Sequence, residues 1–153
     1  MKFLPELYPQ DVDAVPTNAF TLTDGLLGFA GYVHAELLYN AEQLPFLWMK
    51  LSGPAGTVNF VVLEPGMVLP GYEIELFDGD AGSLGLTDPT DALVLNIVTL
   101  NPRFPQAATV NLIGPIVVNR RTRVGRQVVI ENHARYSARH PIVEETLAAQ
   151  ATA

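Results

Sequence analysis

Short hydrophobic runs recur along the whole chain, and each ends at glycine, proline or a polar cluster. Twelve Gly and twelve Pro are spread over the full length, which interrupts helices and leaves short segments between turns. These segments are rich in Val, Ile, Leu, Phe, Tyr and Thr, the residues that favour strands. The clearest predicted strands are residues 33–39, 46–51, 57–63, 72–77, 93–100, 108–112, 116–119 and 124–131. Their regular spacing predicts a mostly β fold, a small antiparallel β-barrel-like domain or a sandwich.

In two of these runs, the order of apolar and polar residues also indicates which faces of the strand are covered. Residues 93–98 are apolar at both parities apart from Asn96, as in a central strand that is covered on both faces. Residues 116–131 resemble a hairpin that turns through 119–122, and Arg126 leaves one face of its second strand only partly apolar.

Two segments could be helical. Residues 80–86 are long enough for one turn after a strand. Residues 141–149 begin with proline and place Glu144 and Glu145 in the early turns, which predicts a possible C-terminal helix.

Length and composition favour one globular domain over residues 1–153, because a chain of this size buries roughly 68–70% of its unfolded surface. The chain has no Cys, so it has no disulfide framework and no thiolate metal site. The N-terminus is broken by Pro5 and Glu6, and residues 92–100 are far shorter than the ~20 residues of a membrane span. We therefore expect a soluble, cytoplasmic protein with no membrane partner.

The net charge of −7 is unevenly distributed. Residues 1–100 carry 13 acidic and 2 basic side chains, a balance of −11, whereas residues 101–153 have a balance of +4. An acidic surface disfavours direct contact with nucleic acid and would steer a basic partner. The alternative is that the acids only keep an apolar-rich chain soluble. Glu64, Glu73 and Glu75 are the acids that we predict at a partner-binding surface.

Motifs for catalysis and metal binding are missing or incomplete. His34, His133 and His140 lack metal-ligand spacing, so an exposed or structural role is the better interpretation. Ser83 lies in an incomplete nucleophile elbow whose first glycine is replaced by Ala81. The sequence from Asp78 begins like a calcium loop, but Pro89 occupies the position of the bidentate glutamate. We expect no catalytic residue, no metal and no cofactor.

The remaining polar candidates are a basic cluster and two asparagines. Four arginines between 120 and 126 lack interleaved aromatic residues, which favours a solvated hairpin tip over an RNA-binding surface. Asn96 and Asn111 interrupt apolar strands, where an unpaired buried amide would cost ~1–3 kcal/mol. We favour a structural role for Asn111 and leave Asn96 open between a structural role and an interface role. Thr99, Asn101 and Pro102 are candidate rim residues of that interface.

An ordered series of segments resembles one known family. Residues 95–102 (LNIVTLNP) and 108–119 (ATVNLIGPIVVN) are similar to the signature of the flagellar assembly factor FliW. Gln127-Val128-Val129, Tyr136-Ser137 and His140-Pro141 continue the series in the expected order, and residues 24–29, 59–65 and 72–74 resemble earlier parts. The resemblance covers residues 19–142 and is strongest from 92 to 141.

The resemblance implies a non-enzymatic partner switch. FliW proteins bind flagellin in the cytoplasm and also bind the translational regulator CsrA, which relieves repression of flagellin translation. Amphipathic helices of flagellin would then dock in an apolar groove. The alternative hypothesis is a small β-barrel enzyme or carrier that binds a small molecule in its interior.

Overall fold

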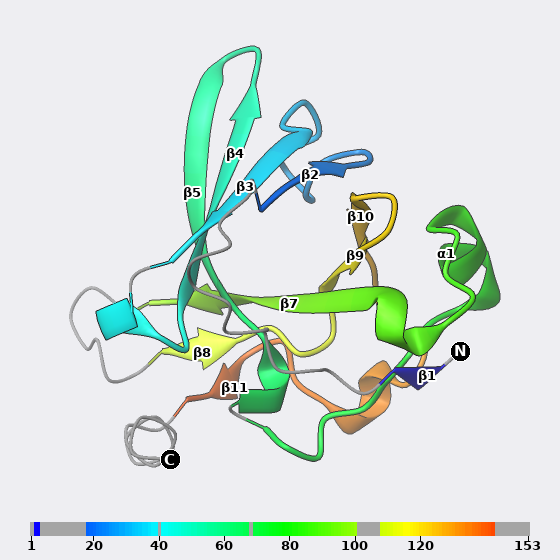
Figure 1. Cartoon of the computed structure of the whole chain (residues 1–153). Helices are drawn as coiled ribbons and strands as arrows, with labels where there is room; N and C mark the ends of the chain where they lie inside the picture. Colours follow the sequence, from blue (N-terminus) through cyan, green and yellow to red (C-terminus); the bar gives the residue numbers. More distant parts are fainter. Residues whose placement is uncertain (1, 4–17, 40, 68, 101–107, 143–153) are drawn as a thin grey trace.

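The computed structural model describes residues 2–3, 18–39, 41–67, 69–100 and 108–142, and it is built mainly from strands (Figure 1). The strands are β1 (Lys2–Phe3), β2 (Ala19–Leu22), β3 (His34–Leu38), β4 (Leu47–Gly53), β5 (Gly56–Leu63), β6 (Ile74–Glu75), β7 (Ala92–Thr99), β8 (Thr109–Val110), β9 (Ile116–Asn119), β10 (Val124–Gln127) and β11 (His140–Pro141). The helical segments are α1 (Asp78–Ser83) and the 3-10 turns η1 (Ala41–Gln43), η2 (Pro65–Met67), η3 (Pro89–Asp91) and η5 (His133–Arg135).

Within the described residues, seven strands close a barrel in the order β7-β5-β4-β3-β2-β10-β9, and β9 pairs again with β7. Six of these seven pairings are antiparallel, and the pairing of β2 with β10 is parallel. An odd number of strands in a closed ring cannot alternate in direction throughout, so one parallel pairing is required. The predicted β-barrel is therefore confirmed, with this one exception to its antiparallel arrangement.

The barrel interior is filled by apolar side chains that alternate along the strands. The buried members of this cluster are Phe20, Leu22, Leu26, Ala35, Leu37, Leu47, Met49, Leu51, Val62, Leu93, Leu95, Ile116 and Val118. A second core lies against the outer face of β7 and β9 and includes Tyr72, Ile74 and Leu84 from the segment around α1. Strand β7 serves both cores, which confirms the prediction of a central strand covered on both faces.

Each of the eight predicted strands overlaps a strand of the structure, but four of them, β3, β6, β8 and β10, are shorter than predicted. The strand predicted at 124–131 ends at Gln127, although the chain stays extended and the N–H groups of Val128 and Ile130 donate to the carbonyls of Pro115 and Ile113. The hairpin through residues 119–122 is confirmed, and Arg123 completes its turn with φ +58°. Strands β1, β2 and β11 were not predicted.

Both helix predictions differ from the structure. The helical turn begins at Asp78 rather than 80 and ends at Ser83, because Leu84 and Leu86 are buried in the second core. Pro141 belongs to strand β11, so a C-terminal helix cannot begin there. The rest of that predicted helix, residues 143–149, lies outside the described residues.

Candidate functional site

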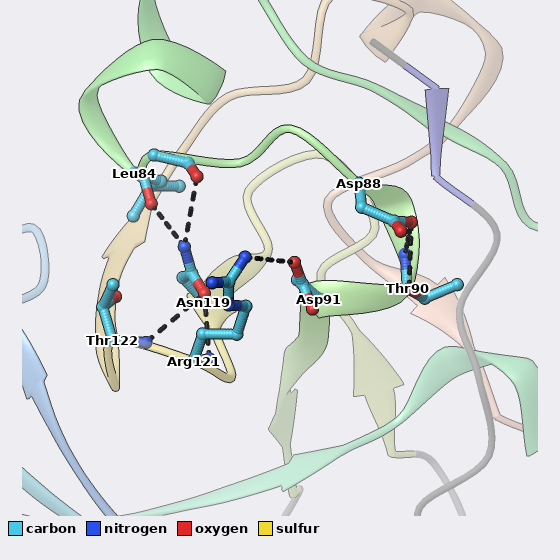
Figure 2. A network of polar contacts seen from close by, with 8 residues as sticks. Leu84, Asp88, Thr90, Asp91, Asn119, Arg121 and Thr122 are labelled. Atoms are coloured by element: carbon cyan, nitrogen blue, oxygen red, sulfur yellow. Dashed lines mark hydrogen bonds and ion pairs between the residues drawn. The ribbon is translucent and has the colours of Figure 1, made fainter.

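A polar network joins the end of α1 to the β9–β10 hairpin, and its centre is Asn119 (Figure 2). The buried side chain donates from Nδ2 to the carbonyls of Leu84 (2.8 Å) and Gly85 (3.4 Å). Its Oδ1 accepts from the backbone N–H groups of Arg121 (2.9 Å) and Thr122 (3.4 Å). Because both ends of the amide are occupied within the protein, Asn119 holds the hairpin turn rather than a ligand.

Asp88 precedes η3 and Asp91 is its last residue, beside this network (Figure 2). Asp88 caps the turn, and its Oδ1 accepts from the backbone N–H and the hydroxyl of Thr90, both at 2.9 Å. These hydrogen bonds to the charged form lower the pKa of the Asp88 carboxyl. Asp91 forms an ion pair of 3.8 Å with Arg121. Both acids therefore stabilise local structure.

Acids from separate segments face the arginines of the hairpin. Arg126 lies 3.9 Å from Asp24 and 3.7 Å from Asp80, and it donates to Oγ of Ser83 at 3.0 Å. Arg120 lies 4.0 Å from the buried Glu64. The prediction of a solvated hairpin tip holds for Arg121, which is 74% exposed, but is wrong for Arg120 and Arg126, which are partly buried against these acids.

Asn96 lies inside the second core and is fully buried. Its Nδ2 donates to the carbonyl of Asn111 (2.7 Å) and to the hydroxyl of Tyr72 (3.4 Å), and that hydroxyl donates to the carbonyl of Leu112. Burial raises the pKa of the Tyr72 hydroxyl. Oδ1 of Asn111 accepts from the N–H groups of Ile113 (3.1 Å) and Gly114 (3.0 Å), which confirms its structural role.

The predicted partner-binding residues that the structure describes differ in exposure. Glu64 and Asn96 are buried, so neither side chain is presented at the surface. Glu73 and Glu75 are half-buried in the segment that contains β6, where Asn132 donates to the Glu73 carbonyl (2.8 Å) and accepts from the Glu75 N–H (2.9 Å). Thr99 is exposed at the end of β7. Asn101 and Pro102 lie outside the described residues.

A surface feature that the sequence analysis missed is a partly exposed apolar row across three strands. Leu38 on β3 lies opposite Trp48 on β4, and Trp48 lies opposite Val61 on β5. Leu38 is 45% exposed and Trp48 is 38% exposed, whereas Val61 is half-buried. The sequence does contain a signal for this row. Successive side chains of a strand point to opposite faces, so Trp48, which lies between the inward-facing Leu47 and Met49 in a predicted strand, faces outward. We call Leu38, Trp48 and Val61 the apolar row.

These features define a class of protein: a small closed β-barrel whose interior holds a cluster of buried apolar side chains. Among the described residues, no three His, Asp or Glu side chains gather as metal ligands. In the same part of the chain, no helix is both long and apolar enough to cross a membrane.

Comparison with known proteins gives one consistent result. A family profile described as FliW protein matches residues 7–142. The flagellar assembly factor FliW of Treponema pallidum (strain Nichols) is 38% identical over 126 residues, covering 82% of this chain and 81% of that protein. The FliW of Bdellovibrio bacteriovorus is 37% identical over 131 residues, covering 86% of this chain and 73% of the relative.

A solved structure agrees with these relatives. The crystal structure of a flagellar assembly factor FliW matches with a TM-score of 0.71 and 30% identity, over 90% of this chain and 89% of that one. The chain belongs to the FliW family of flagellar assembly factors.

Proposed function

We propose that this protein is a non-enzymatic cytoplasmic assembly factor that binds flagellin and the translational regulator CsrA, and so relieves CsrA repression of flagellin translation. The observation that carries the proposal is membership of the FliW family over residues 7–142. Under this proposal, free flagellin captures the protein and releases CsrA, so that flagellin limits its own synthesis.

The charges of the described residues support a protein partner rather than a nucleic acid. Three of the four arginines of the hairpin, the densest basic cluster in the sequence, lie near acids, which reduces the positive potential that phosphates need. These acids are Glu64 after β5, Asp91 in η3, Asp80 in α1 and Asp24 after β2. The large acidic excess over residues 1–100 suits a basic protein such as an RNA-binding regulator.

Competition between the two partners tests the proposal. By linkage, flagellin must lower the affinity for CsrA by the same factor by which CsrA lowers the affinity for flagellin. Titrating flagellin into a preformed complex with labelled CsrA should release the label. Overlapping sites give complete release, and separate sites give a finite coupling of ~1–3 kcal/mol.

A stable ternary complex with unchanged CsrA affinity would exclude the switch and leave at most a flagellin-binding role. Failure of flagellin to bind at all would exclude the proposal itself.

A further inference from the structure

Strand β5 pairs along almost its full length on one side but only at one end on the other. Its register with β4 runs from Gly56 to Val62. Its register with β7 covers only Val61, Val62 and Leu63. The first part of the strand, residues 56–60, extends beyond β7 in the β4–β5 hairpin (Figure 1). Among the described strands, none pairs with this part on the side away from β4. We call residues 56–60 the open edge.

The hydrogen bonds of β7 show which backbone groups of the open edge point outward. The carbonyl of Ile97 points toward β8, where it accepts from the N–H of the residue after that strand (2.9 Å). Bonding direction alternates along a strand, so the neighbouring Val98 bonds toward β5, and Val61 opposite it bonds toward β7. By the same alternation, the N–H and carbonyl groups of Thr57 and Asn59 point away from β4. The open edge therefore presents two donors and two acceptors.

The open edge lacks the features that usually protect the edge of a sheet. Exposed edges are commonly blocked by charged side chains, by proline within the strand or by a bulge. Residues 51–63 contain no charged side chain, and their one proline, Pro54, lies in the turn before β5. The register of β5 with β4 is continuous, without a bulge. The open edge can therefore accept another strand.

One face of the open edge is apolar and incompletely covered. Val58 and Phe60 pack against the barrel core but are only half-buried. The ring of Phe60 meets Phe29 edge to face, with 5.3 Å between the centroids. Thr57 and Asn59 alternate with these residues and are exposed. A strand added at the open edge would bury more of the apolar face and leave the polar face in water.

A second copy of the same edge fits these groups in one antiparallel register. If Val58 lies opposite Val58 of the second copy, Thr57 lies opposite Asn59, and each of these two pairs exchanges two backbone hydrogen bonds. All the outward groups of both copies are then used. On the exposed face, the order across the four strands is Lys50, Asn59, Thr57 and Ser52, so no two charged side chains meet.

We propose that the protein forms a two-fold symmetric homodimer in which the open edges of two copies pair antiparallel about Val58. A second copy is the favoured occupant, because a chain of net charge −7 repels its copy over most surfaces but not at this uncharged edge. The contact is small, so the expected Kd is about 10 μM to 1 mM. The inference is independent of the proposed function, since it requires neither flagellin nor CsrA.

Two double variants test the register. Thr57→Glu with Asn59→Glu places acids opposite acids across the dimer, whereas Thr57→Lys with Asn59→Glu places a base opposite an acid in both pairs. The two variants differ only at one exposed position and share the acid beside Lys50.

Sedimentation equilibrium measures the association of all three proteins. The average mass of the wild type should rise from 16.6 kDa toward twice that value as its concentration approaches about 1 mM. The acid–acid variant should dimerise about tenfold more weakly or worse, whereas the base–acid variant should match or exceed the wild type. Thermal melts in dilute solution check that each variant is folded.

A single cysteine provides a second test, which traps the dimer. The chain has no Cys, and Val58 lies on the proposed two-fold axis. The two Cα atoms there would be ~4.5 Å apart, within the range of a disulfide. Val58→Cys should therefore form a covalent dimer under mild oxidation. Ala55→Cys, in the exposed turn before β5, is the matched control and should stay monomeric at the same concentration.

The outcomes decide the inference without reference to the proposed function. A wild-type mass that stays at one chain up to about 1 mM would overturn the homodimer. Equal Kd values for the two double variants, or equal cross-linking of Val58→Cys and Ala55→Cys, would overturn the proposed pairing. A rising mass, opposite effects of the two charge variants and selective cross-linking at Val58 would establish it. Binding of flagellin or CsrA is tested separately.

Discussion

At the scale of single residues, the polar side chains inside the strands act as internal ties. Asn96, Asn111 and Asn119 each hydrogen-bond backbone groups of another segment or of a following turn. Buried amides with these partners fix one arrangement of the chain, because an alternative packing would leave them unpaired. The apolar pattern left the role of Asn96 open between the structure and an interface, because its partners Asn111 and Tyr72 come from segments whose positions the pattern does not contain.

Replacing Asn96 tests this structural role. Asn96→Ala removes the 2.7 Å bond to the Asn111 carbonyl and the contact with the Tyr72 hydroxyl, so unfolding should become easier by about 1–3 kcal/mol. The melting temperature should fall by several degrees. Asn59→Ala, an exposed site on β5, is the control and should change stability by less than about 0.5 kcal/mol. An unchanged melting temperature together with lost partner binding would instead identify Asn96 as an interface residue.

Tyr72 predicts the behaviour of the protein at alkaline pH. Burial raises the pKa of its hydroxyl in the folded state above the ordinary value of 10.0, so above pH 10 the unfolded state loses this proton first. The stability contribution is therefore complete below pH 10 and declines as pH rises toward the folded pKa, with a slope of at most ~1.4 kcal/mol per pH unit. Urea unfolding from pH 8 to 11 should show a shallower decline for Tyr72→Phe. Equal slopes for the two proteins would refute the assignment.

At the scale of elements, closure of the barrel depends on β10, which pairs with β9 on one side and β2 on the other. Gly125 lies at the centre of this contact. A Cβ at that position would lie 2.8 Å from Cγ2 of Val118 and 3.0 Å from the Val117 carbonyl oxygen. The close approach of β9 and β10 therefore requires glycine.

Gly125→Ala should destabilise the protein by about 1–3 kcal/mol, because the buried Val118 has no room to move away. Gly82→Ala provides a matched comparison in α1, where a Cβ would meet no atom within 4 Å. That substitution should leave stability unchanged or raise it by about 0.5–1 kcal/mol. Chemical denaturation of both variants measures the difference, and equal effects would contradict the packing argument.

The sequence predicts some strands of the structure but not others. Runs of strand-favouring residues predict β3, β4, β5 and β7, and the run of β7 is apolar at both parities because that strand lies between the two cores. Strand β2 was not predicted, and its parallel partner β10 begins about a hundred residues later, so local sequence does not contain this pairing. The apolar row could not be predicted for the same reason, since it appears only once the registers of β3, β4 and β5 are known.

At the scale of the whole molecule, the FliW resemblance of the sequence is confirmed, whereas the partner-binding role of the acids stays a prediction. The structure shows which of the three acids are suitable for testing that prediction. Glu64 is buried beside Arg120, so reversing its charge would disturb the fold as well as the surface. Glu73 and Glu75 are only half-buried, and replacing them is therefore the better test of electrostatic steering.

A graded charge series tests whether the acidic excess recruits CsrA. Converting Glu73 and Glu75 to Gln removes two negative charges, and converting both to Lys changes the local charge by four. If long-range attraction speeds encounter, the logarithm of the association rate should fall about twice as far for the Lys pair as for the Gln pair, with a smaller change in dissociation. The difference should shrink as salt rises, because exposed charges are screened beyond ~8 Å at 0.15 M. Stopped-flow association at low and high salt measures all of these rates. Wild-type rates in every variant, independent of salt, would show that the acids serve solubility alone.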